Sequence, residues 1–195
     1  VGERATLREE TAPAQVAVVI DRSGSMSGHK LESAVRATAQ LIRSLSPKDR
    51  IGIVAYDNQV TPVSPLVSPS ESLARDVERI QCGGSTNLYG GWLFGAKMVG
   101  EGGRVILLSD GLANCGRFQD ADDLACHASR SFTKYRVTTS TVGIGRDYDE
   151  ALMAGMARHG GGGHYFADDP EAVVRAFSEE RFAIDAEAYS HVSLK

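Results

Sequence analysis

The sequence predicts an α/β fold: a doubly wound, mostly parallel sheet with helices on both faces and one antiparallel edge strand. Short, nearly continuous apolar segments such as QVAVVI (15–20) and RVILLS (104–109) are typical of strands buried on both faces. Segments with apolar residues every three or four positions alternate with them, as helices do. Parallel strands joined by crossover helices produce this alternation.

The first half of the chain shows this alternation clearly. KLESAVRATAQLIRSL (30–45) has one apolar face, and Pro47 marks the end of that helix. IGIVAY (51–56) is the next strand. Residues 60–69 contain three prolines, which confine that segment to a sheet edge. The short turn between these segments predicts antiparallel pairing.

The second half repeats the pattern. We expect helices and strands over the following approximate ranges: helices 70–80 and 89–99, strand 104–109, helix 119–134, strand 137–145, helix 149–158, strand 163–167 and helix 170–181. The glycines at 160–163 predict a flexible turn before the last strand.

The two ends of the chain fit the alternation poorly. ATLREE (5–10) and YSHVSLK (189–195) have the composition of short strands. We expect them to pair with each other or to belong to neighbouring domains of a longer chain. The domain itself is therefore expected over residues 14–183, with 1–13 and 184–195 as terminal strands or linkers.

Composition narrows the classes of partner. The chain has 195 residues, enough for one well-packed core, with 21 basic and 25 acidic side chains and no basic block. This balance predicts neither a nucleic-acid partner nor an anionic membrane surface. No apolar run reaches the roughly 18 residues of a membrane-spanning helix, so we expect no span in this sequence.

Three cysteines, Cys82, Cys115 and Cys126, lack the CxxC spacing of a zinc site. They are either free thiols or include a bridge between Cys115 and Cys126. A bridge would indicate an oxidising compartment. Localisation therefore stays open between the cytoplasm and the cell surface.

Oxygen-bearing side chains follow two of the predicted strands. Asp21 ends the first strand, with Ser23 and Ser25 at alternate positions after it, and Asp110 ends the strand 104–109. In an open parallel sheet, ligands bind outside the carboxyl ends of the strands, where the winding reverses. The loop GGSTN must return to the same rim, and it brings Thr86 there.

These segments resemble a known site. DRSGS, GGSTN and LLSDG are similar to the three segments of the metal-ion-dependent adhesion site (MIDAS) of the von Willebrand factor type A (vWA) domain. The resemblance extends over about residues 15–182 and to bacterial members, through TSTVGIGRDYDE and the glycine-rich run. It implies a Rossmann-like fold and the following metal ligands: Asp21, Ser23, Ser25, Thr86 and Asp110.

The residue types agree with that implication. Oxygen ligands without His or Cys suit a hard divalent ion, so we expect Mg²⁺, with Mn²⁺ or Ca²⁺ as substitutes. The resemblance implies that both aspartates act mostly through water, which leaves a coordination position for an Asp or Glu of a protein partner. We expect a rim around the metal to contact this partner, formed by His29, Asn87, Tyr89 and Asn114.

Simpler interpretations stay open for the individual residues. Asp21 can cap the following helix, Asp110 and Gly111 can form a turn, and Asn114 can structure its loop or position a metal-ligating residue. A purely structural metal and a metal-dependent hydrolase are alternative functions. The sequence contains no GxSxG turn and no phosphate loop, so we expect no catalysis.

Overall fold

The computed structural model describes residues 13–169 and 171–180. Six strands form one sheet in the order β3-β2-β1-β4-β5-β6, and they are β1 (Gln15–Asp21), β2 (Arg50–Tyr56), β3 (Val60–Val67), β4 (Arg104–Ser109), β5 (Thr138–Ile144) and β6 (Gly161–Ala167). All neighbouring pairs are parallel except β2 and β3. The predicted fold class is therefore confirmed, including the antiparallel edge strand.

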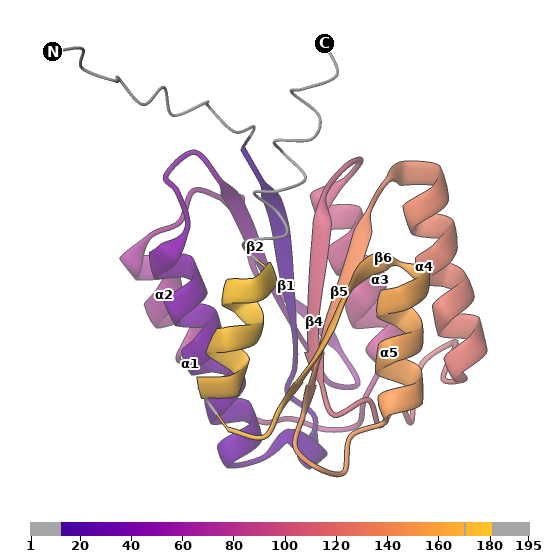
Figure 1. The fold of residues 1–195 in the computed structure, drawn as a ribbon. Helices are drawn as coiled ribbons and strands as arrows, with labels where there is room; N and C mark the ends of the chain where they lie inside the picture. Colours follow the sequence, from indigo (N-terminus) through magenta and orange to yellow (C-terminus); the bar gives the residue numbers. More distant parts are fainter. Residues whose placement is uncertain (1–12, 170, 181–195) are drawn as a thin grey trace, which may run out of the picture.

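Helices cover both faces of the sheet (Figure 1). They are α1 (His29–Ser44), α2 (Glu71–Val77), α3 (Leu88–Val99), α4 (Ala121–Tyr135), α5 (Glu150–His159), the short 3-10 turn η1 (Gly24–Met26) and a last helix over 171–180. In Figure 1, α1, α2 and the last helix lie on one side of the sheet, and α3, α4 and α5 lie on the other.

Two apolar cores explain the continuous apolar strands. In β1, Val16, Val18 and Ile20 pack into the core beneath α1, whereas Ala17 and Val19 pack into the core beneath α3. Both faces of the strand are buried, so every position is apolar. Helix α3 lies close to β1 because Gly95 has no side chain, and a Cβ there would overlap Val19.

The edges and ends differ from the centre. Strand β3, which contains Pro62 and Pro65, lies at the edge of the sheet, where one side of the strand needs no ladder hydrogen bonds. The glycines at 161–163 belong to β6, so the flexible turn expected there was wrong. The terminal strands expected at 5–10 and 189–195 lie outside the described residues. Within the described residues, every helix is too short or too polar to cross a bilayer.

Candidate metal centre

The expected rim lies at the point where the strand order reverses. Strands β1 and β4 are neighbours, with Ile20 beside Leu108, although strands β2 and β3 and helices α1, α2 and α3 lie between them in the chain. Asp21 ends β1 and Asp110 follows β4, and both side chains are fully buried. The structure thus brings together two carboxylates that are far apart in the sequence.

Asp21 is held by donors from three different segments. Its Oδ1 accepts a hydrogen bond from the backbone N–H of Ser23 at 2.8 Å. Its Oδ2 accepts from Ser109 Oγ at 2.6 Å and from the Tyr56 hydroxyl at 3.2 Å. Burial nevertheless raises the pKa of the Asp21 carboxyl, because desolvation outweighs these hydrogen bonds. A nearby cation would favour the charged carboxylate.

Ser109 and Tyr56 were missed by the sequence analysis, although each is the last residue of its strand. Burial raises the pKa of the Tyr56 hydroxyl well above its ordinary value, with the Asp21 charge adding to the effect. Tyr56 therefore stays protonated and donates to Asp21. Their positions at strand ends are visible in the sequence, but their contacts with Asp21 depend on the register of the strands.

The two serines after Asp21 lie together on the loop that leads to α1. Ser23 Oγ and Ser25 Oγ are 3.2 Å apart; Ser23 is buried and Ser25 is exposed. Gly24 N–H donates to Gly84 O at 2.8 Å, which joins this loop to the one that carries Thr86. Helix α1 begins after Gly28 with no side-chain cap, so the capping role considered for Asp21 is wrong.

Thr86 presents a buried hydroxyl that lacks a partner. Among the described residues, its Oγ1 has no hydrogen-bond partner, and the residue is 1% exposed. Its backbone is fixed, because Thr86 N–H donates to Asn114 Oδ1 at 2.8 Å and Asn114 N–H donates to Thr86 O at 3.2 Å. Asn114 thus positions Thr86 and leaves its hydroxyl free to bind a ligand.

Asp110 has a basic partner that the sequence analysis also missed. Lys30 Nζ lies 3.1 Å from Asp110 Oδ2, from the first turn of α1. Asp110 and Gly111 also form the turn considered for them, since Gly111 has a φ of +73° and donates to Ser109 Oγ at 2.8 Å. Asp110 therefore both begins a tight turn and presents a carboxylate at the rim.

The residues expected to contact a partner have different surroundings. His29 is exposed, 3.5 Å from Glu32. Asn87 caps α3, because its Oδ1 accepts from Gly90 N–H at 3.0 Å. Tyr89 packs against Phe118 and His127.

All three cysteines are free thiols in the structure, so the bridge considered between Cys115 and Cys126 is not formed.

Comparison with known proteins agrees with this architecture. The sequence profile of the von Willebrand factor type A domain matches residues 15–180. The chain belongs to the vWA domain family. A Synechocystis protein, sll0103, is 25% identical over 186 residues, covering 92% of this chain and 43% of its own length. The vWA chain therefore spans less than half of that relative.

Other relatives carry the vWA domain within larger proteins. Human inter-alpha-trypsin inhibitor heavy chain H4 is 26% identical over 168 residues, which is 78% of this chain and 18% of that protein. The solved structure of BatB from Bacteroides thetaiotaomicron has a TM-score of 0.73 at 18% identity, covering 88% of this chain and 98% of BatB. At this identity the structural likeness concerns the fold alone.

Two further solved structures share this fold. Proximal thread matrix protein 1 from the mussel byssus, described with a zinc-occupied MIDAS motif, has a TM-score of 0.70 at 17% identity, over 87% of this chain and 47% of that one. The vWF domain of the pilus tip protein Mfa5 from Porphyromonas gingivalis has a TM-score of 0.68 at 16% identity, over 92% and 97%.

The donor set expected from the sequence consists mainly of hydroxyls. The part of the chain that the structure describes holds no group of three or more His, Cys, Asp or Glu side chains placed to bind a metal. The expected set has two carboxylates and three hydroxyls. Such a set suits a hard ion that keeps part of its water shell.

Proposed function

We propose that this vWA domain is a divalent-metal-dependent protein-binding module. In this proposal Mg²⁺, with Mn²⁺ or Ca²⁺ as substitutes, is held by the MIDAS residues, which are Asp21, Ser23, Ser25, Thr86 and Asp110. The bound ion supplies an open coordination position that attracts an Asp or Glu side chain of a protein partner.

The unpartnered hydroxyl of Thr86 carries this proposal. Leaving a buried hydroxyl without a hydrogen bond costs about 1–3 kcal/mol. Thr86 Oγ1 is such an atom, and its backbone is held by Asn114. A hard cation beside the hydroxyl would satisfy it and would also compensate the two buried carboxylates. These residues therefore fit a metal better than they fit a purely structural role.

The relatives support the same function. The MIDAS motif of the mussel byssus protein is described with zinc, and Mfa5 is a protein of a pilus tip. We transfer from them only the class of site and the class of function: a metal-binding rim in a domain that contacts other proteins.

We further propose that the domain has no catalytic activity. DRSGS, GGSTN and LLSDG contain no carboxylate or imidazole besides the two aspartates assigned to the metal. A hydrolase needs a further group to move a proton. Turnover of generic ester or phosphate substrates that depends on divalent metal would contradict this part of the proposal.

The decisive variant is Thr86→Val. We expect it to fold at least as stably as the wild type without metal, because valine has the shape of threonine and the hydroxyl has no partner to lose. We expect its Mn²⁺ affinity, followed by water-proton relaxation, to fall at least about tenfold. Ser85→Ala, which removes the exposed neighbouring hydroxyl, is the matched control and should leave the affinity unchanged.

The same titration separates the alternatives. Relaxation enhancement by bound Mn²⁺ requires an inner-sphere water that exchanges, so strong enhancement supports an open coordination position. Equal Mn²⁺ binding by the wild type and Thr86→Val would contradict the assigned site. Tight binding without an exchangeable water would indicate a closed structural metal and would contradict partner binding through the ion.

A further inference from the structure

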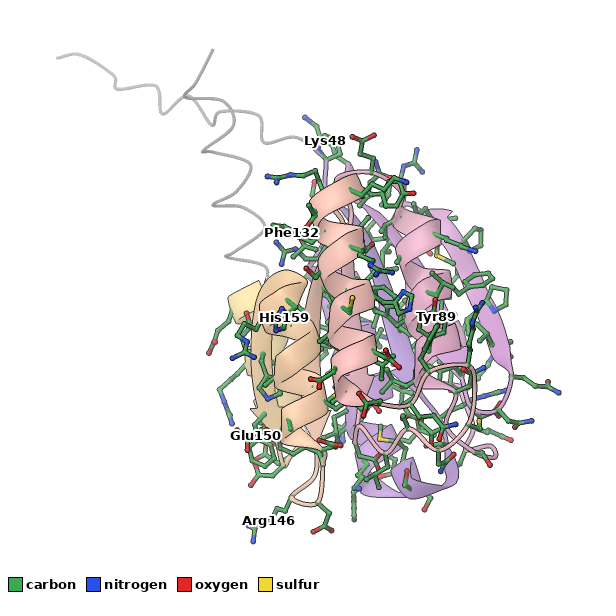
Figure 2. The ribbon with its side chains drawn as sticks, turned by 90° about the vertical axis from the view of Figure 1, so that its right-hand side faces the viewer. Lys48, Tyr89, Phe132, Arg146, Glu150 and His159 are labelled. Carbon is green, nitrogen blue, oxygen red and sulfur yellow. The ribbon has the colours of Figure 1, made fainter. Side chains whose placement is uncertain are left out.

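A surface pocket borders the segments that carry the candidate metal centre. Its volume is about 330 Å³, and it is formed by the first turn of α3, the end of the 111–120 loop and the part of α4 from Asp123 to Arg130. Figure 2 shows Tyr89 beside α4, on the side of that helix that faces α3. The MIDAS residues do not line this pocket.

Three rings form one wall of the pocket. Tyr89 and Phe118 meet edge to face with their centroids 4.8 Å apart. His127 lies 4.5 Å from Phe118 and 4.9 Å from Tyr89 between centroids. All three residues are half-buried, so each ring is fixed by its neighbours. The wall is therefore preorganised.

Two arginines make the mouth of the pocket basic. Arg117 and Arg130 line the pocket and are exposed, and the Arg117 guanidinium lies 5.3 Å from the Phe118 ring centroid. Neither forms an ion pair with another described residue, whereas most other arginines of the rim and helices do. Asp123 is the single acidic lining residue. The charge of the pocket favours an anionic group.

The pocket is joined to the metal rim by short, well-packed connections. Tyr89 follows Thr86 by three positions, and Asn87 between them caps α3. The 111–120 loop begins next to Asp110, holds Thr86 through Asn114, and packs Gly116 against Asn87, where a Cβ would overlap the amide. The pocket and the metal rim therefore share two segments, the start of α3 and the 111–120 loop.

We propose that this pocket is a second carboxylate subsite for the same partner. An acidic segment would place one carboxylate on the metal and a second acidic side chain between Arg117 and Arg130, with its methylene groups against the rings. This inference rests on the proposed function and specifies the partner: a segment with at least two acidic side chains rather than one.

The test uses a fluorescein-labelled peptide of ten glutamates, with binding to the domain followed by fluorescence polarisation in Mg²⁺. We expect Arg117→Gln/Arg130→Gln to weaken binding about tenfold, because two charge contacts are lost. Arg36→Gln/Arg158→Gln changes the net charge equally at exposed sites on α1 and α5, and should change binding less than about twofold.

Further readings make the test specific. The Mn²⁺ affinity and thermal unfolding of both double variants should equal those of the wild type. Equal weakening by the two double variants would overturn the subsite, because it would reflect net charge alone. If Arg117→Gln/Arg130→Gln weakens peptide binding but chelator leaves it unchanged, the two-point arrangement is overturned. If neither chelator nor Thr86→Val changes peptide binding, it is the proposed metal function that fails.

Discussion

Lys30 Nζ lies 3.1 Å from Asp110 Oδ2, so a lysine of α1 pairs with the carboxylate that follows β4. The Asp110 side chain is 0% exposed and that of Lys30 is 25% exposed. The lysine reaches the rim across Gly145, where φ is +84° and a Cβ would lie 2.5 Å from Lys30 Cε. Without metal, Lys30 supplies the positive charge that the buried carboxylate needs.

Lys30→Met should destabilise the metal-free domain and strengthen its binding of metal. Removing the ammonium leaves Asp110 buried and unpaired, and because Lys30 is partly exposed we expect a loss of about 1–3 kcal/mol in the free energy of unfolding. The same change removes a positive charge that repels the incoming ion, so Mg²⁺ should bind more tightly. Urea unfolding in chelator and in Mg²⁺ measures both effects.

Lys97→Met is the matched control for this substitution, because Lys97 is an exposed lysine on α3. It should change neither the metal-free stability nor the Mg²⁺ affinity. If Lys30→Met in chelator were as stable as the wild type, the ion pair with Asp110 would contribute nothing to the metal-free fold.

Asp21→Asn should separate stability from metal binding. The raised pKa of Asp21 shows that burial disfavours its charge, so the neutral amide should leave metal-free stability at pH 7 equal or higher. The amide oxygen can accept from Ser23 N–H, and its NH₂ can donate to the hydroxyls of Ser109 and Tyr56. Metal-induced stabilisation should disappear. Thermal unfolding with and without Mg²⁺ checks this, and a clear loss of metal-free stability would contradict it.

Much of the fold could be predicted because its strands are buried on both faces. The expected strand 15–20 corresponds to β1 (Gln15–Asp21), and the expected 104–109 matches β4 (Arg104–Ser109). The glycine-rich start of β6 (Gly161–Ala167) was missed, because glycine there serves tertiary packing: a Cβ on Gly161 would overlap Phe132 of α4, and one on Gly162 would overlap the backbone of β5. The strand propensity of a residue does not reveal which distant segment will pack closely against it.

The candidate site could likewise be predicted only in part. The candidate ligands could be found because each follows a strand or lies in a recognisable loop. Lys30, Ser109 and Tyr56 could not, because their contacts with Asp110 and Asp21 depend on the register of three strands and on the placement of α1. Those relationships exist only after the sheet has formed.

His164 predicts a dependence of stability on pH. Its two ring nitrogens contact Thr141 Oγ1 at 2.8 Å and the Tyr148 hydroxyl at 3.1 Å. Burial lowers the pKa of His164, and the charge of Glu150 opposes this in part. The unfolded chain takes up the proton near pH 6.5 and the folded domain only at lower pH. Stability from neutral His164 is therefore present above pH 6.5 and is lost as the pH falls through the folded pKa.

His164→Gln should flatten this dependence. Between pH 7.5 and 5 the free energy of unfolding of the wild type should fall by up to about 1.4 kcal/mol more per pH unit than that of the variant. His159→Gln, an exposed histidine on α5, should keep the wild-type slope. Urea unfolding at several pH values measures the slopes, and parallel curves for wild type and His164→Gln would contradict the assignment.

A buried ion pair between Arg104 and Glu180 joins the start of β4 to the last described helix. Ser140 Oγ donates to Glu180 Oε1 at 2.7 Å, and both charged residues are at most 5% exposed. Arg104→Met should lower the free energy of unfolding by about 3–5 kcal/mol, because it leaves a buried carboxylate without its cation. Arg104→Met/Glu180→Met should be more stable than Arg104→Met, because apolar groups then replace both charges. Circular dichroism in increasing urea measures the set. A double variant whose loss equals the sum of the losses of Arg104→Met and Glu180→Met would show that the two charges do not interact, because the effects of coupled partners are not additive.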